Sequence, residues 1–273
     1  MNKLLFGTAG IPVSAKGTST ERGIEWVRKL GLDCMELEFV RAINIKKERA
    51  PEVKRVAEQN SITLTCHAPY FINLNSEEKK TYHASVSYIV NSARISFLCG
   101  AQSVAFHAGY YMKKGKEQTY EKIKIGVKEI IRTLKDEDIK IWIRPEISGR
   151  VSQFGDLNEL IKLSQEVDQV MPCIDFAHLH ARAIGDYNKY DEFVNIFEQL
   201  EKGLGKEALK SMHIHITGIA YSDKGEKHHL NLKESDFNYK DLCKVWKDFK
   251  IEGIVISESP NIEEDALLVK KEY

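Results

Sequence analysis

The sequence is poor in the features that mark a highly charged binding protein, a membrane protein or a secreted protein. Lys plus Arg and Asp plus Glu are both 40 among 273 residues, so no net charge draws the whole chain to nucleic acid or to an anionic membrane. Apolar runs are too short for a membrane span, and the N-terminal run is too short for a signal peptide. The five cysteines include no Cys-x-x-Cys pair, which predicts reduced thiols in a cytoplasmic protein.

The sequence also lacks the signs of a divided chain. It contains no linker rich in proline or glycine, no low-complexity tract and no repeat beyond a strand followed by a helix. Its length allows one large hydrophobic core, so a single domain over residues 1–273 is predicted. Gly-x-Gly-x-x-Gly does not follow the first expected strand, which disfavours a doubly wound, dinucleotide-binding sheet.

Short apolar runs alternate with longer amphipathic segments along the whole chain. This alternation predicts parallel strands joined by helices, and eight such pairs in a chain of this length fit an α/β fold, the (β/α)8 TIM barrel. The expected strands are residues 4–7, 34–40, 62–68, 103–107, 139–143, 170–175, 212–216 and 254–256. The expected helices are residues 18–31, 50–60, 76–99, 119–135, from 156 onward, 190–202, 239–249 and 262–271, with a long polar loop after the seventh strand.

Side chains that can bind metals collect where these strands end. Active sites of such barrels lie at the C-terminal ends of the strands. Eight of the nine histidines lie there, and only His83 falls within a helix. Burying several carboxylates and imidazoles at one barrel mouth is costly unless cations compensate them, and this mixture suits zinc or another first-row transition metal. The residues are His67, His107, Glu146, Asp175, His178, His180, His213, His215, Glu226, His228, His229 and Glu258.

Seven ordered motifs resemble those of the endonuclease IV family of apurinic/apyrimidinic endonucleases. The resemblance runs from the third strand to the eighth and is weaker in the first sixty residues. The motifs are residues 67–74 (HAPYFINL), 106–109 (FHAG), 145–146 (PE), 173–178 (CIDFAH), 212–213 (MH), 227–229 (KHH) and 257–258 (SE).

The resemblance implies a trinuclear zinc site. The implied ligands are His67 and His107 for the first zinc, Asp175, His213 and Glu258 for the second, Glu146 as a bridge between these two, and His178, Glu226 and His228 for the third. Glu226 departs from the family pattern, which has the shorter aspartate there, so the third site is the least secure. Hydroxide held beside the catalytic Glu146 would attack the phosphodiester 5′ to an abasic deoxyribose.

The resemblance also implies a substrate, double-stranded DNA that contains abasic sites, and a monomeric enzyme. Tyr70 and Phe71 stand where residues of the family enter the base stack. Contacts with DNA phosphates need only a local rim of basic residues around the site. The alternative interpretation of these basic residues is an ordinary solvated loop surface. Basic residues in segments that leave strand ends are Arg41, Lys46, Lys47, Lys113, Lys114, Lys116, Arg150 and Arg182.

Three histidines have no counterpart in the family's ligand set. Strand alternation places His213 and His215 both on the inner face of the barrel. His215 is therefore expected to support a neighbouring ligand through a hydrogen bond, or alternatively to replace that neighbour as the ligand. His180 and His229 are expected to be polar loop residues.

Two other functions remain open. Sugar isomerases and epimerases of xylose-isomerase-like barrels are similar in placing Glu, Asp, His and Glu on strands five to eight around one divalent metal. His67, His107, His178 and His228 exceed what such a site needs, which favours the nuclease. The second alternative is a zinc-containing barrel that recognises damaged DNA without cutting it, and it is motivated by Glu226 and the weak match of the first two strands.

Overall fold

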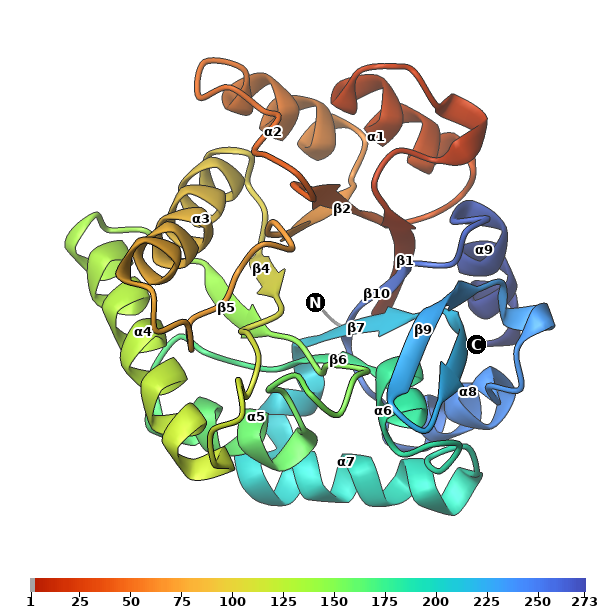
Figure 1. Ribbon diagram of the computed structural model, residues 1–273. Helices are drawn as coiled ribbons and strands as arrows, with labels where there is room; N and C mark the ends of the chain where they lie inside the picture. The colour runs from red at the N-terminus through yellow and green to blue at the C-terminus, as the bar shows by residue number, and fades with distance from the viewer. Residues whose placement is uncertain (1–2) are drawn as a thin grey trace.

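The protein is a barrel of parallel strands surrounded by helices, as the computed structural model of residues 3–273 shows (Figure 1). Eight strands pair side by side in the order β5-β4-β3-β2-β1-β10-β7-β6. Isolated bridges from Ile143 to Val170 and from Glu146 to Cys173 link the two end strands, so the ring is nearly closed. The predicted (β/α)8 barrel is confirmed.

The barrel strands and their covering helices follow the expected alternation. The strands are β1 Leu4–Ala9, β2 Cys34–Glu38, β3 Thr63–His67, β4 Ser103–Phe106, β5 Trp142–Pro145, β6 Cys173–Asp175, β7 Met212–Ile216 and β10 Gly253–Ser257. The covering helices are α1 Thr20–Lys29, α2 Ala50–Gln59, α3 Lys79–Leu98, α4 Lys116–Asp136, α5 Leu157–Glu166, α7 Tyr190–Leu204, α8 Tyr239–Asp248 and α9 Glu263–Glu272. Short 3-10 turns are η1 Val13–Ala15, η2 Lys206–Lys210 and η3 Leu232–Glu234.

β5 and β6 begin about three residues later than their apolar runs indicated. Ile139, Ile141 and Val170 are buried, but they lie in the segments that approach the strands. Hydrophobic periodicity reports burial, and it does not distinguish a buried approach segment from a paired strand. Because the ends of these strands are in place, the residues that follow them still reach the barrel mouth.

Two elements at the mouth replace expected loops. Helix α6, Phe176–Arg182, begins directly after β6, because the Asp175 side chain accepts a hydrogen bond from the His178 backbone N–H at 2.7 Å and caps the helix. The polar segment after β7 forms an antiparallel hairpin of β8 Gly218–Ser222 and β9 Gly225–Leu230, which lies at the rim of the barrel near α6 in Figure 1. Its turn needs Gly225, whose φ is 88° and whose position leaves 2.2 Å between an added Cβ and the Gly149 carbonyl oxygen.

Alternation along the strands separates an apolar shell from a polar barrel interior. On β2, Met35 and Leu37 face the helices, while Glu36 points into the barrel with a fully buried side chain. Thr65, Arg144 and His213 are other buried polar residues of the barrel strands. Barrel interiors are ordinarily filled by branched aliphatic side chains, so this polar filling indicates an interior that serves the site at the mouth.

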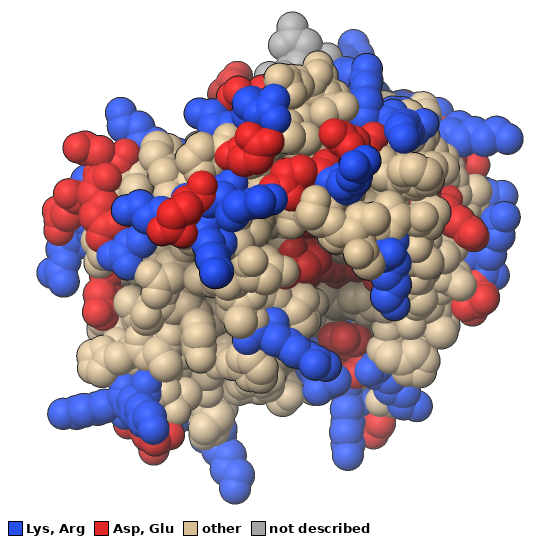
Figure 2. All heavy atoms as spheres, turned by 90° about the horizontal axis from the view of Figure 1, so that it is seen from above, with Lys and Arg blue, Asp and Glu red and all other residues tan. Residues whose placement is uncertain are grey.

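The surface agrees with the neutral composition. The face in Figure 2, seen from the side on which Figure 1 shows α1 and α2, carries Lys and Arg side chains among Asp and Glu. All five cysteines are buried with free thiols. Within residues 3–273, no helix is both long and apolar enough to cross a bilayer.

Candidate metal centre

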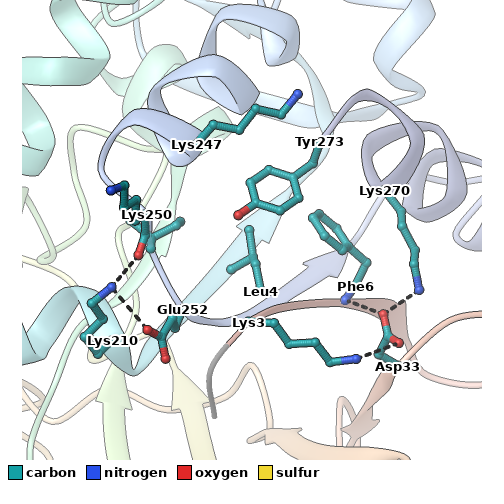
Figure 3. Close-up of a pocket in the computed structure, with 11 residues that line it drawn as sticks. Lys3, Leu4, Phe6, Asp33, Lys210, Lys247, Lys250, Glu252, Lys270 and Tyr273 are labelled. Atoms are coloured by element: carbon teal, nitrogen blue, oxygen red, sulfur yellow. Dashed lines mark hydrogen bonds and ion pairs between the residues drawn. The ribbon is translucent and has the colours of Figure 1, made fainter.

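A large cavity at the N-terminal end of the barrel contrasts with the mouth. It has a volume of about 730 Å³ and is lined by lysines around an apolar floor that includes Phe6 and Tyr273. Figure 3 shows three of its five lysines paired with acids, among them Lys210 with Glu252 at 3.1 Å and Lys270 with Asp33 at 2.6 Å. Residues at this end of a barrel serve stability rather than catalysis, so we place the candidate site at the opposite end.

The mouth holds a smaller cavity of about 200 Å³. It lies at the C-terminal ends of the strands, and Glu226 and His229 of the β8–β9 hairpin form part of its wall. Its walls combine aromatic rings, imidazoles, carboxylates and one guanidinium, a mixture that suits a polar, anionic ligand and a cation together. The lining residues are Tyr70, Ile72, His107, Gly109, Tyr110, Arg150, Gln153, His178, Glu226, His229 and Glu258.

Ligand-type side chains at the mouth form three adjoining groups. Within each group, one potential ligand atom per residue lies within 4.8 Å of those of the other members. Glu146 belongs to two of the groups and so joins them. The groups are His67, His107 and Glu146; Glu146, Asp175, His215 and Glu258; and His178, Glu226 and His229.

Glu146 lies at the centre of these groups. Its Oε2 atom is 3.0 Å from His67 Nε2 and 3.5 Å from His107 Nε2. Its Oε1 atom is 3.2 Å from both His178 Nδ1 and His215 Nδ1. Burial opposes ionisation of this carboxyl, but His107, His215 and His178 outweigh that effect and hold the pKa of Glu146 well below its usual value. The carboxylate is therefore charged at neutral pH.

The outer ring nitrogens of these imidazoles are anchored by oxygen atoms. His67 Nδ1 donates to the Ala68 carbonyl at 2.7 Å, and His229 Nδ1 lies 3.2 Å from the Glu258 carbonyl oxygen. His107 Nδ1 is 3.3 Å from Ser148 Oγ. Histidines that bind metals usually donate their second nitrogen in this way, which fixes the tautomer and turns the free lone pair toward the metal.

The donor set fits zinc. Among the described residues, Glu146 Oε1, Asp175 Oδ2 and His215 Nδ1 are buried atoms without a hydrogen-bond partner, although they belong to one group. Unsatisfied buried polar atoms are costly, and a cation at the centre of the group would satisfy all of them. Imidazole nitrogens and carboxylate oxygens are the zinc ligands of catalytic sites.

Seven of the nine residues expected as ligands come together at the mouth. His228 is exposed, and His213 lies one layer deeper in a further group with Cys173 and His215. His215 and His229 take the positions expected for these two residues in the groups at the mouth. The seven residues are His67, His107, Glu146, Asp175, His178, Glu226 and Glu258.

Strand register explains the exchange of His213 for His215. Both rings point into the barrel, but His215 pairs with Asp175 at the end of β6, whereas His213 pairs with Cys173 one layer deeper. The deeper ring has its Nδ1 atom 3.0 Å from Ser103 Oγ and its Nε2 atom 3.0 Å from Glu36 Oε2. The motif match names the deeper ring, whereas the group of Glu146, Asp175 and Glu258 contains His215. Of the two expectations for His215, replacement of its neighbour agrees with this geometry.

A β-bulge explains the exchange of His228 for His229. Across the hairpin, Tyr221 pairs with Glu226 and Ala220 pairs with His228, so Lys227 is an extra residue. An extra residue reverses the alternation beyond it. His229 therefore shares a face with Glu226, and its Nε2 atom lies 3.3 Å from His178 Nε2, while His228 is exposed. The expectation that His229 is only a polar loop residue is contradicted.

The residues expected to contact DNA divide into two kinds. Tyr70 and Phe71 are 48% and 60% exposed beside the mouth, and the Tyr70 ring stacks on His107 with a centroid separation of 6.3 Å. Arg150 lines the cavity, and Arg41 and Lys113 are exposed.

Arg182 belongs to a different category, because it is used within the protein. Its Nη1 atom donates to the carbonyl oxygens of Ser148, Arg150 and Gln153, and so holds the loop after β5 in place. A guanidinium committed to three backbone carbonyls is a structural clamp, which departs from the expected role in DNA contact. His180 likewise departs from the expected loop, since it is buried on α6 with its Nε2 atom 3.2 Å from Asp236 Oδ1.

Two carboxyl residues escaped the sequence analysis. Glu36 and Glu38 lie on β2, in the part of the chain where the family resemblance is weak. The alternation of Met35, Glu36, Leu37 and Glu38 was a usable signal, because it turns both carboxyls inward. Burial and the neighbouring charge of Glu36 raise the pKa of Glu38 to about 8, which keeps this carboxyl largely protonated at neutral pH.

Residues 24–272 match the sequence profile of the xylose isomerase-like TIM barrel family. The chain belongs to this family. An uncharacterized protein of Methanocaldococcus jannaschii is 44% identical over 270 residues, which cover 99% of this chain and 97% of that protein. A probable endonuclease 4 of Shouchella clausii is 24% identical over 219 residues, or 74% of this chain and 72% of that relative. The resemblance inferred from the motifs is thereby confirmed.

Solved structures of this fold include two with different reactions in their names. A D-tagatose 3-epimerase-like protein superposes with a TM-score of 0.75 at 18% identity, covering 98% of this chain and 94% of the other. Endonuclease IV of Thermus thermophilus superposes with a TM-score of 0.74 at 18% identity, covering 98% of this chain and 97% of the other. At such identities the likeness extends to the fold alone, so function has to be argued from the site.

We expect His229→Ala to remove or weaken one zinc position and His228→Ala to leave it intact. The reason is that the bulge turns only His229 toward His178 and Glu226. Zinc per chain, measured by mass spectrometry on both purified variants, tests this. Loss of zinc in His228→Ala with full retention in His229→Ala would contradict the assignment of the hairpin.

Proposed function

We propose that the protein is a zinc-dependent DNA repair endonuclease that hydrolyses the phosphodiester 5′ to abasic sites in double-stranded DNA. The observation that carries the proposal is the continuity of the three ligand groups around Glu146 and His178. Two or three metal ions a few ångströms apart are an arrangement typical of enzymes that cleave phosphodiesters. Similarity to a probable endonuclease 4 and seven ordered motifs support the same reaction.

The chain's own residues would divide the work at the mouth. Zinc ions, when bound, would supply Lewis-acid polarisation of the phosphate and a lowered pKa for coordinated water. Glu146 would keep the two neighbouring positions together, since its oxygens face different groups. Arg150, on the cavity wall, would pair with a phosphate oxygen of the DNA backbone.

A sugar epimerase or isomerase is the second candidate function. It is favoured by the group of Glu146, Asp175, His215 and Glu258, which by itself resembles a single-metal site on strands five to eight. The epimerase-like neighbour also superposes as well as the endonuclease does. A single-metal reaction leaves the other two groups unexplained, so we place the nuclease first.

Tyr70 and Phe71 would contact the DNA where the abasic nucleotide leaves the stack. Tyr70 is fixed at the cavity edge by its stacking on His107, and Phe71 next to it is 60% exposed. Two adjacent exposed aromatic side chains beside a polar site offer a surface that unstacked bases would cover. The gap in the stack would be filled by these rings.

We expect Glu146→Gln to abolish incision of a duplex that contains one abasic site. The substitution keeps the shape of the side chain but removes the charge that links two ligand groups. Incision is measured on an end-labelled duplex, with circular dichroism to verify folding. Glu25→Gln, an exposed carboxylate on α1, is the control and should cut normally. Undiminished incision by Glu146→Gln would refute this role. Epimerisation of a ketose with no incision by the wild type would favour the second candidate.

We expect Tyr70→Ala combined with Phe71→Ala to weaken binding of an abasic duplex at least ~10-fold, since stacking on an aromatic ring contributes about 1–3 kcal/mol. Fluorescence anisotropy in the Glu146→Gln background measures binding without cleavage. Ile125→Ala, which truncates a 61% exposed side chain on α4, is the matched control. If the double variant binds as tightly as the control and has an unchanged zinc content, the proposal that these two rings enter the base stack is contradicted.

A further inference from the structure

We propose that Glu36 is a positioning residue that turns His215 so that this ring binds metal through Nδ1. Glu36 lies at the middle of β2 with a fully buried side chain. Its carboxylate lies between two imidazoles of β7, with Oε1 at 2.9 Å from His215 Nε2 and Oε2 at 3.0 Å from His213 Nε2. The contact spans the barrel interior, because β1 and β10 separate β2 from β7 in the sheet.

The two nitrogens of His215 face different partners. Nε2 faces Glu36, while Nδ1 lies 3.2 Å from Glu146 Oε1 and 3.4 Å from Glu258 Oε1. An imidazole that binds a metal keeps one proton, on the nitrogen that faces away from the metal, and a carboxylate can only accept it. With its Oε1 atom 2.9 Å from Nε2, Glu36 would hold that proton on Nε2 and leave the Nδ1 lone pair directed at the ligand group.

The other imidazoles of the mouth also have an oxygen atom beside their outer nitrogen, but the type of oxygen differs for His215. The outer nitrogens of His67, His107 and His229 meet a backbone carbonyl or a serine hydroxyl. His215 instead meets a carboxylate. A charged partner makes the imidazole a stronger electron donor than a carbonyl does, which increases its basicity as a ligand. Glu36 would thus strengthen the metal position shared by Asp175 and Glu258.

The surroundings hold Glu36 in this position. Thr65 Oγ1 on β3 donates a hydrogen bond to Glu36 Oε2 at 2.8 Å. His213, on the far side, has its Nδ1 atom 3.0 Å from Ser103 Oγ on β4. Contacts thus run from β4 through His213 and Glu36 to His215, so four strands fix the orientation of one ring. His213, one layer beneath the three groups of the mouth, thus has a part in placing Glu36.

The inference rests on the metal centre of the proposed function, but it holds for a nuclease and for an epimerase alike. It concerns metal binding and is therefore tested without an activity assay.

The test compares zinc binding by the wild type, Glu36→Gln and Glu38→Gln. Glutamine can donate its amide to His215 Nε2, which would force the proton onto Nδ1 and block that ligand atom. We expect Glu36→Gln to weaken one zinc position about 10- to 100-fold, measured by competition with a chromophoric chelator. Glu38→Gln removes another inward carboxyl of the same strand and should weaken that position less. Equal affinity in Glu36→Gln and the wild type would overturn the inference.

A second measurement covers the case in which Glu36→Gln does not fold. Long-range proton–nitrogen NMR correlations of ring-labelled histidines in the full-length wild-type protein report the tautomer of His215 directly. In the zinc-loaded protein we expect the proton on Nε2, and an Nε2 atom without a proton would overturn the proposal. A wild-type protein that binds no zinc would instead refute the proposed metal centre, so the two failures are distinguishable.

Discussion

The burial of the Glu146 carboxylate among four imidazoles is the constraint on which the barrel mouth depends. These rings come from different parts of the chain, and all lie within 3.5 Å of the carboxylate oxygens. A charged group removed from water is stable only when opposite charge or a cation compensates it. Charge compensation therefore requires β3, the loop after β4, β7 and α6 to bring their imidazoles to one point, and the ring of parallel strands permits it.

The loops and the helix around Glu146 are also held in place by contacts with one another. Asp175 caps α6 and at the same time presents its second oxygen to the ligand group. Arg182 at the end of α6 clamps the loop after β5, and the adjoining Gly149 carbonyl accepts a hydrogen bond from the Glu226 backbone N–H of the hairpin. Elements that look separate along the chain thus set one another's position, and a change in one of them reaches the metal centre.

Much of this arrangement was predictable from the sequence, and the exceptions have physical causes. Alternating apolar runs were sufficient to predict the barrel, because parallel strands buried on both faces are rich in apolar residues. The positions of ligand-type residues at strand ends predicted most of the ligand groups, because the C-terminal ends of all parallel strands lie at the same end of a barrel. The depth of His213 against His215 depends on register with β6, and the choice of His229 depends on a bulge at Lys227; neither is encoded in local composition. Glu36 was missed because its partner lies across the barrel on β7.

The metal content of the protein tests the central claim most directly. The measurement is zinc per chain, by mass spectrometry, on protein purified without added metal or chelator. The three ligand groups predict close to three zinc ions per chain. A single divalent ion per chain, particularly manganese or magnesium, would contradict the trinuclear centre and would favour the epimerase.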